Sequence, residues 1–262
     1  MLKALLARAH QKHRTIGFPD QPPVLPDRLR GRPEINTAKC PDGCRVCAEV
    51  CPTDAITVDK QGVRLDLGRC LFCPECERAC PEGAIHFTAE PRLATSTRDA
   101  LILGDKEFQL ASALDDKARK LFGRSLKLRQ VSAGGCNGCE ADVNVLNTVV
   151  FDLGRFGIQF VASPRHADGL LITGPVTRNM EAALRQTYEA VPSPKLVIAV
   201  GACAISGGPY LGHAEQRDGA QAVLPVDLYI PGCPPHPITI LDGLLRLLGR
   251  MDSACGKSPN MR

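Results

Sequence analysis

The sequence predicts an α/β domain with a parallel sheet and helices on both faces, preceded by a small α+β domain. From residue 126 onward, short apolar runs alternate with stretches of helical periodicity, which is typical of a parallel sheet covered by helices. Residues 36–90 instead contain two similar halves, which indicate a small domain with pseudo-twofold symmetry. A length of 262 residues suits one small and one medium domain better than two large ones.

The larger domain is expected to contain five strands and three helices. Its strands are predicted at residues 126–131, 158–162, 170–173, 196–200 and 228–230. Its helices are predicted at residues 141–152, 177–191 and 237–251. Thr177 can cap the second helix, and Pro237 suits the first turn of the third.

The remaining segments are expected to be extensions and linkers. Residues 1–14 have apolar side chains on one helical face and basic side chains elsewhere, which predicts a short amphipathic helix that lies on an anionic membrane, contacts a partner or simply caps the chain. Five prolines in residues 18–33 predict an extended connector. The expected organisation is therefore a helix and Pro-rich extension, a small domain, a linker and the α/β domain, at residues 1–34, 35–92, 93–124 and 125–255.

Cysteine use is the main compositional signal. The chain has thirteen cysteines but no apolar run long enough for a membrane span, and its basic first residues make a poor secretory signal. Disulfides need an oxidising compartment, so metal binding in a reducing cytoplasm is expected instead. The formal charge of +4 counts every cysteine as a neutral thiol, and three bound clusters would change it to about −2. The basic balance therefore does not argue for nucleic-acid binding.

Eight cysteines in the small domain predict two 4Fe-4S clusters. The second run has the bacterial ferredoxin spacing Cys-x2-Cys-x2-Cys-x3-Cys-Pro, in which the fourth cysteine ligates the other cluster. The first run has one extra residue before its second cysteine, and Gly43 can absorb the resulting bulge. This rule assigns the first cluster to Cys40, Cys44, Cys47 and Cys80, and the second cluster to Cys70, Cys73, Cys76 and Cys51.

Zinc is the competing interpretation, because four-cysteine zinc sites also use short paired spacings. Two proline-terminated runs, each followed by an Ala-Ile pair, repeat more of the ferredoxin pattern than zinc requires. Four thiolates saturate each cubane, so outer-sphere electron transfer is expected rather than catalysis. Each half is too small to bury a core of its own, so the clusters are expected to supply much of the domain's stability.

Four further cysteines predict a third cluster in the larger domain. Each follows a predicted strand, so all of them can meet at the carboxyl edge of a parallel sheet, where such sheets build their sites. Neighbouring glycines allow tight turns beside a cluster. The alternative is a group of ordinary buried thiols. The cysteines are Cys136, Cys139, Cys203 and Cys233.

Four motifs surround these cysteines: Gly-Gly-Cys136-Asn-Gly-Cys139-Glu140, Ser163-Pro-Arg-His-Ala-Asp168, Gly201-Ala-Cys203-Ala and Pro231-Gly-Cys233-Pro-Pro235. Together they resemble one known family, the small subunits of group 4 (membrane-bound, energy-converting, formate hydrogenlyase-type) NiFe hydrogenases. That family includes the 20 kDa-type subunit of respiratory complex I, and the resemblance implies a flavodoxin-like fold. Residues 1–90 independently resemble the ferredoxin-like subunit of formate hydrogenlyase and complex I, so the chain resembles a fusion of two subunits.

The resemblance implies an electron-transfer subunit that relays electrons through three 4Fe-4S clusters to or from a NiFe site on a partner large subunit. It also implies membrane-arm partner subunits, through which the chain would lie on the cytoplasmic face of the membrane. The chain would not be catalytic alone, because only Cys255 is left over to bind nickel. One alternative is a complex I-like subunit whose third cluster lies next to a quinone site. The complex I members of the family resemble one another in having two adjacent cysteines at this motif, so the spaced Cys136 and Cys139 resemble the hydrogenase branch instead. Another is a free-standing ferredoxin-type carrier.

Five other residues are considered near these motifs. Glu140 could relay protons beside the third cluster, or could favour a helix N-terminus through the macrodipole. Arg165 and His166 could tune that cluster, contact the large subunit or form an ion pair with Asp168. We expect His86 to be structural and Cys255 to be incidental.

Overall fold

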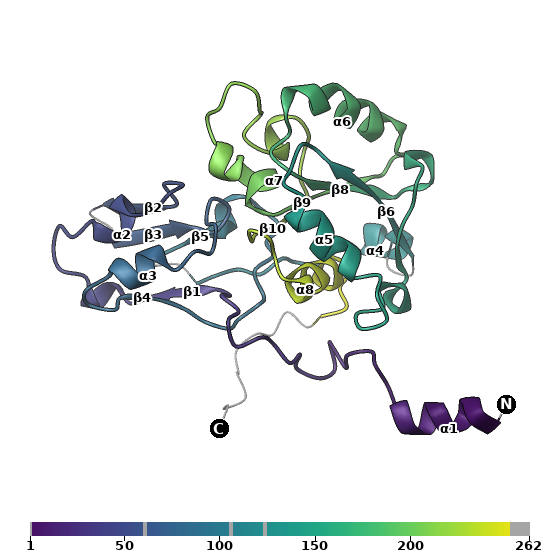
Figure 1. The fold of residues 1–262 in the computed structure, drawn as a ribbon. Helices are drawn as coiled ribbons and strands as arrows, with labels where there is room; N and C mark the ends of the chain where they lie inside the picture. Colours follow the sequence, from purple (N-terminus) through teal and green to yellow (C-terminus); the bar gives the residue numbers. More distant parts are fainter. Residues whose placement is uncertain (1, 60–61, 105–106, 123–124, 252–262) are drawn as a thin grey trace.

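The computed structural model describes residues 2–59, 62–104, 107–122 and 125–251. The small domain and the α/β domain lie side by side, and an N-terminal helix projects away from both (Figure 1). This helix is α1 (Leu2–Gln11), where the amphipathic pattern predicts one. None of the helices in the described ranges has the length and apolar character that a bilayer crossing requires.

The expected parallel sheet forms the centre of the larger domain. In the described residues its strands are β6 (Leu126–Ser132), β7 (Ile158–Phe160), β8 (Gly169–Thr173), β9 (Leu196–Val200) and β10 (Leu228–Ile230). Their order is β10-β9-β8-β6-β7, and every pairing is parallel. Numbered within the domain, this is the flavodoxin-like order 2-1-3-4-5. The predicted fold class is confirmed.

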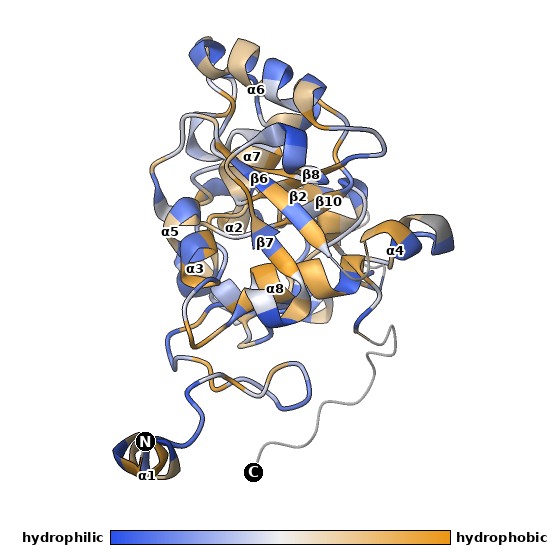
Figure 2. Ribbon diagram, turned by 90° about the vertical axis from the view of Figure 1, so that its right-hand side faces the viewer, coloured by the Kyte–Doolittle hydropathy of each residue, from blue (hydrophilic) through white to orange (hydrophobic). Residues whose placement is uncertain are grey.

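Helices cover both faces of this sheet. They are α5 (Gly138–Val145), α6 (Arg178–Ala190), α7 (Ala202–Ser206) and α8 (Pro237–Leu247). Successive strand residues point to opposite faces, so Leu170 and Ile172 of β8 lie in one apolar core with Leu184 of α6, while Leu171 lies in a second core with Leu244 of α8. Helix α8 is buried throughout and is largely hydrophobic (Figure 2). Helix α5 was expected at residues 141–152, but it starts three residues earlier and is shorter. The apolar pattern of the sequence did not predict α7.

The small domain contains the expected repeat. Each half consists of a cysteine-rich loop, a short helix and a strand: α2 (Val46–Glu49) precedes β2 (Ile56–Asp59), and α3 (Glu75–Ala79) precedes β4 (Ile85–Phe87). Strand β4 pairs antiparallel with β1 (Pro33–Ile35), and β2 pairs with β3 (Gly62–Asp66). Outside the strands and α-helices, short 3₁₀ turns occur at Thr37–Lys39, Asp99–Leu101, Leu153–Phe156, Pro164–His166, Gly208–Tyr210 and Ala220–Ala222.

The segment expected as a linker is built into both domains. Strand β5 (Ile102–Leu103) adds to the small domain's sheet beside β3, so the expected boundary at residue 92 leaves out part of that sheet. Thr95 exchanges two backbone hydrogen bonds with Tyr229 of β10, at 3.0 and 2.9 Å, and extends the parallel sheet by one antiparallel bridge. Further along, α4 (Asp116–Phe122) lies where a weak helical stretch occurs in the sequence.

The small domain does not rely on its own residues alone for a core. Leu65, Leu67 and Ile85 are at most 2% exposed, and they belong to the same apolar cluster as Leu184 of α6 and Ile205 of α7. The small domain therefore has an apolar core of which the α/β domain supplies one wall. That bound clusters supply much of its stability stays a prediction.

Replacing Leu171 by Ala tests the importance of the central sheet. Leu171 is fully buried in β8, so the cavity left by the substitution is expected to destabilise the fold by about 2–5 kcal/mol. Chemical denaturation followed by circular dichroism measures the loss. Leu121→Ala is the control, because Leu121 is 60% exposed and its truncation should cost much less; equal losses in the two variants would contradict this account.

Candidate iron–sulfur sites

The two halves of the small domain repeat the same cysteine turn. The Ala55 amide donates a hydrogen bond to Cys51 Sγ, and the Ala84 amide donates to Cys80 Sγ, each at 3.2 Å. The residue before each alanine has a left-handed backbone, with φ of 48° at Asp54 and 57° at Gly83. This turn aims an amide at the sulfur, and such N–H···S contacts stabilise a thiolate that binds a cluster.

The first predicted ligand set lines one cavity. Its sulfurs are surrounded by apolar side chains that include Val46, Val63 and Ile85. Gly43 has a φ of 75°, and a Cβ placed there would meet open space. The extra residue of this loop is thus accommodated by a left-handed turn, as the sequence suggested. The lining cysteines are Cys40, Cys44, Cys47 and Cys80.

The second predicted set lines a neighbouring cavity with apolar walls at Ile56, Leu65 and Leu71. The Phe72 amide donates to Cys70 Sγ at 3.3 Å. Phe72 has a φ of 54°, so it takes the left-handed position before the second cysteine that Gly43 takes in the first run. The lining cysteines are Cys51, Cys70, Cys73 and Cys76.

Burial keeps these thiols protonated when no metal is bound. Burial is the largest cause that raises the pKa of Cys70 and that of Cys76 to about 12 each. Neighbouring cysteines raise both values further, while the hydrogen bond from the Phe72 amide lowers the pKa of Cys70. Thiolates bind iron and thiols do not, so cluster binding must release protons from these side chains. A cluster supplies positive iron centres that offset the cost of this deprotonation, which makes cluster loading and local folding a coupled process.

The third predicted set gathers at the carboxyl edge of the parallel sheet. Cys136 and Cys139 follow β6, Cys203 lies in α7 directly after β9, and Cys233 follows β10. After burial, the charges of Cys233 and Cys136 are the main causes that raise the pKa of Cys203, to about 11, so these sulfurs lie near one another. Cys136 and Cys233 are exposed. This set therefore opens toward the surface.

Gly201 makes room for this third set. It has a φ of 91°, and a Cβ added to it would lie 2.4 Å from Cys139 Sγ. Gly208 is similarly close to the third set, since its added Cβ would lie 2.9 Å from Cys203 Sγ. A side chain at either position would occupy the space of a thiol, so the glycines permit the convergence of these strand ends.

Two of the three cysteine sets each surround a cavity. Within the described ranges, no group of three or more His, Cys, Asp or Glu side chains is arranged to hold a single metal ion. A four-iron cubane instead takes one thiolate at each iron, so its four ligands surround a volume. The two cavities lined by four cysteines fit that requirement.

Glu140 lies beside the third set and is 6% exposed. It occupies the first turn of α5 and accepts hydrogen bonds from Ser132 Oγ at 2.6 Å and Thr173 Oγ1 at 2.7 Å. Its charge contributes to the raised pKa of Cys139 and Cys203. Both hydrogen bonds go to the same carboxylate oxygen, Oε1.

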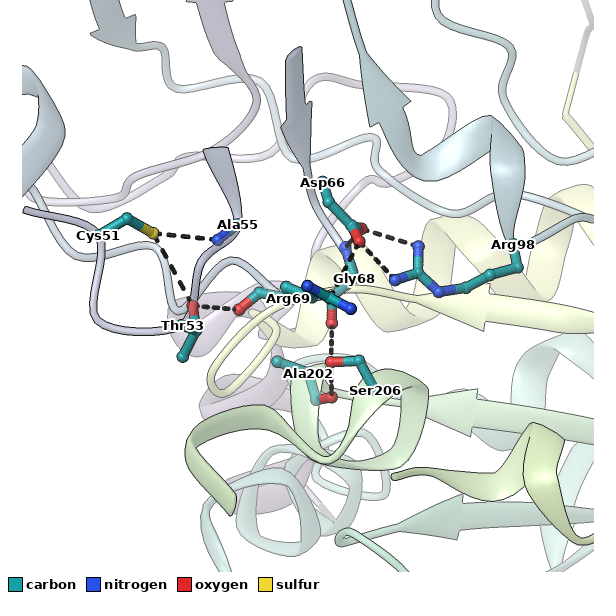
Figure 3. Close-up of polar contacts among 9 residues, drawn as sticks. All are labelled: Cys51, Thr53, Ala55, Asp66, Gly68, Arg69, Arg98, Ala202 and Ser206. Atoms are coloured by element: carbon teal, nitrogen blue, oxygen red, sulfur yellow. Dashed lines mark hydrogen bonds and ion pairs between the residues drawn. The ribbon is translucent and has the colours of Figure 1, made fainter. Parts of the chain in front are cut away.

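A buried joint connects the second set to the third. Ser206 of α7 donates to the carbonyl of Gly68 at 2.8 Å, two residues before Cys70 (Figure 3). Gly68 is packed closely there, since an added Cβ would lie 2.8 Å from Arg98 Cζ and from Ile205 Cγ2. The contact joins residues 138 positions apart, so no local sequence signal indicated it.

An ion pair reinforces this joint. The Asp66 carboxylate accepts hydrogen bonds from both terminal nitrogens of Arg98, at 2.7 and 2.6 Å, and from the Gly68 amide at 2.8 Å. Arg98 follows Thr95, which pairs with β10, the strand that leads to Cys233. Cys73 of the second set is near enough to raise the pKa of Cys233, after burial and Cys136. The second and third sets are therefore neighbours.

Of the three roles considered for Arg165 and His166, tuning of the third cluster does not fit where they lie, and contact with a large subunit stays a prediction. Both line a cavity together with Lys127 and Pro194, at the amino edge of the sheet and so opposite the third set. The loop after β7 returns to the start of β8, which places them there. Among the described ion pairs neither is joined to Asp168, whose carboxylate accepts the Lys127 amide at 2.6 Å.

The last two residues considered in the sequence are His86 and Cys255. His86 Nδ1 lies 2.6 Å from Glu77 Oε1 on the surface of the small domain, which agrees with a structural role. Cys255 lies outside the described residues.

Comparison with known proteins identifies both halves of the chain. Residues 136–247 match the family model of the NADH ubiquinone oxidoreductase 20 kDa subunit, and residues 39–84 match a 4Fe-4S dicluster domain. A probable membrane-bound hydrogenase subunit of Pyrococcus furiosus is 41% identical over 132 residues, which cover 50% of this chain and 79% of that relative. The chain belongs to the NADH ubiquinone oxidoreductase 20 kDa subunit family.

Other members of this 20 kDa subunit family come from two kinds of complex. Formate hydrogenlyase subunit 7 of Escherichia coli is 44% identical over 133 residues, or 51% of this chain, and the match spans only about half of that relative, 52%. An NADH-quinone oxidoreductase subunit of Desulfovibrio desulfuricans is 42% identical over 168 residues, which cover 63% of this chain and 87% of that relative. Family membership and the dicluster domain make this chain an iron–sulfur electron-transfer protein that carries 4Fe-4S clusters. The predicted family resemblance is confirmed.

Replacing Gly201 by Ala should remove the third site alone. The new Cβ would displace Cys139 Sγ and would also strain a backbone with a φ of 91°. We expect anaerobically purified protein to lose about four irons per chain, with the other clusters retained. Gly212→Ala is the matched control, because Gly212 has a φ of 76° but open space at its Cβ position. Full iron content in Gly201→Ala would contradict the proposed role of Gly201.

Proposed function

We propose that this chain relays electrons through three 4Fe-4S clusters to or from a NiFe site on a partner large subunit, in hydrogen evolution or oxidation of the formate hydrogenlyase type. The observation that carries the proposal is the hydrogen bond from Ser206 to the Gly68 carbonyl, which joins α7, the helix that holds Cys203 of the third set, to the loop just before Cys70 of the second set. Electrons would pass from the first cluster through the second to the third, or in the reverse direction.

The cavities and the strand ends support the following ligand sets. Residues 35–92 together with β5 would form the two-cluster domain, and residues 125–255 would form the third-cluster domain. The first cluster would bind Cys40, Cys44, Cys47 and Cys80. The second would bind Cys51, Cys70, Cys73 and Cys76. The third would bind Cys136, Cys139, Cys203 and Cys233.

The partner would cover the third site. Cys136 and Cys233 are exposed, so a cluster held there would meet solvent in the isolated chain. A large subunit seated on this face would bring its active site next to the cluster and exclude water. The chain itself would move electrons without binding the substrate, and membrane-arm subunits of the same assembly would hold it at the cytoplasmic face of the membrane.

The spacing of Cys136 and Cys139 favours a hydrogenase-type partner over a quinone-reducing one. Asn137, with a φ of 70°, and Gly138 separate the two cysteines, and α5 begins between them. Relatives that are 41% and 44% identical are named as hydrogenase or formate hydrogenlyase subunits. A complex I-like quinone site next to the third cluster is the second candidate, supported by the NADH-quinone oxidoreductase relatives.

Metal analysis tests the cluster count. Anaerobically purified chain should hold about twelve irons with matching labile sulfide and little zinc. Cys233→Ser should remove one paramagnetic signal and leave two, because only the third site loses a ligand. Zinc in place of iron, or loss of all three signals in the variant, would overturn the proposal. Co-purification with a hydrogen-active large subunit, as opposed to one that reduces quinone, separates the two candidate functions.

Ser206→Ala should weaken electron transfer between the second and third clusters without removing either. The lost hydrogen bond leaves the buried Gly68 carbonyl without its Ser206 partner, at a cost of about 1–3 kcal/mol, and loosens α7 against the Cys70 loop. Iron content should stay unchanged, while the magnetic interaction between the two reduced clusters decreases and intramolecular electron transfer slows several-fold.

The control for this measurement is Ser112→Ala, which removes an exposed contact with Ser96 that is not part of the buried joint. It should leave both readouts unchanged. An unaltered magnetic interaction in Ser206→Ala would show that the joint does not set the spacing of the clusters.

A further inference from the structure

Helix α1 presents an exposed apolar stripe bordered by positive charge. Leu2, Leu5 and Leu6 are 72%, 65% and 61% exposed, and no residue of the helix is buried. At 3.6 residues per turn these leucines share one face, with Lys3 along one border and Arg8 along the other. An exposed stripe of this kind marks a surface that contacts something else.

The formal excess of positive over negative side chains lies in the segment that contains this helix. The first nineteen residues contain Lys3, Arg8, Lys12 and Arg14 but no Asp or Glu. Setting those four aside leaves 28 Lys and Arg in the rest of the chain, equal to its 28 Asp and Glu. The entire formal excess of positive charge therefore lies in the segment that carries the apolar stripe.

The helix is held at a fixed point on the α/β domain. Ile16 donates its amide to the Val150 carbonyl at 2.9 Å, and Arg155 donates to the carbonyls of Ile16 and Phe18 at 2.9 and 2.6 Å. Phe18 is 7% exposed in the core that contains α8. Val149, at the same anchor, is 71% exposed. The anchor is therefore ordered, while α1 itself projects away from both domains (Figure 1).

We propose that α1 is a docking surface for an anionic lipid bilayer. The leucines would enter the boundary between headgroups and acyl chains, and the basic side chains at their borders would reach the lipid phosphates. The concentration of unbalanced positive charge favours a negatively charged membrane surface over a neutral apolar groove on a protein. This goes beyond the proposed function, because it gives the chain a direct contact with lipid in addition to its partner subunits.

Vesicle flotation with the full chain, loaded with its clusters, tests the proposal. Wild-type protein should float with vesicles containing phosphatidylglycerol and should bind pure phosphatidylcholine vesicles at least several-fold more weakly. Replacing Leu2, Leu5 and Leu6 by Ser, or Lys3 and Arg8 by Gln, should weaken binding roughly tenfold or more. High salt should also weaken the binding of the wild-type protein to anionic vesicles.

Leu121→Ser is the matched control, because Leu121 is 60% exposed on α4 but lies outside this basic segment, and it should float like the wild type. Iron content should be equal in all variants, which keeps this test separate from that of the clusters. Absence of flotation with anionic vesicles, or equal binding by wild type and the leucine variant, would overturn the proposal. Loss of partner subunits from the leucine variant, without any vesicle binding by the wild type, would assign the helix to a protein contact and also overturn it.

Discussion

A single apolar core joins the two-cluster domain to the α6 and α7 face of the parallel sheet, and the placement of the thiols depends on it. Leu65 and Leu67 of the small domain share this core with Ile172 and Leu184 of the larger one. Cys47, Cys70 and Cys76 are buried in the same cluster. Because close-packed interiors deform little, a core shared in this way fixes the relative position of cysteines that are far apart in the sequence.

Polar contacts add direction to that apolar attachment. Apolar packing is not directional, whereas the Ser206 hydrogen bond and the Asp66–Arg98 ion pair specify which residues face each other across the joint. Gly68 and Asp66 lie two and four residues before Cys70. Ser206 is in the same helix as Cys203, and Arg98 lies three residues after Thr95, which pairs with β10 ahead of Cys233. The same few residues thus attach one domain to the other and fix the position of the second cysteine set relative to the third.

The features that could be predicted from the sequence are those that depend on local sequence pattern. Apolar runs located the strands of the sheet. Cysteine spacing placed Cys80 in the first set and Cys51 in the second, and each of them lines the same cavity as the other cysteines of its set. The sequence did not indicate α7, which has only five residues, or the attachment of β5 to β3. Helix α7 is too short to show a periodic pattern. The pairing of β5 with β3 joins segments that are distant in the chain, and periodicity carries no information about such pairings. Arg165 was considered near the third set but lies at the opposite edge of the sheet. Its motif does not indicate at which edge of the sheet this loop lies.

The bridge between Thr95 and Tyr229 has a consequence for how the chain can be divided. Strand β10 is an edge strand of the parallel sheet. Exposed edge strands tend to pair with strands of other molecules. The segment between the domains occupies part of that edge. A protein cut between the domains would expose backbone donors and acceptors close to Cys233, and would be prone to self-association there. Joining the two units in one chain thus also protects the sheet from aggregation.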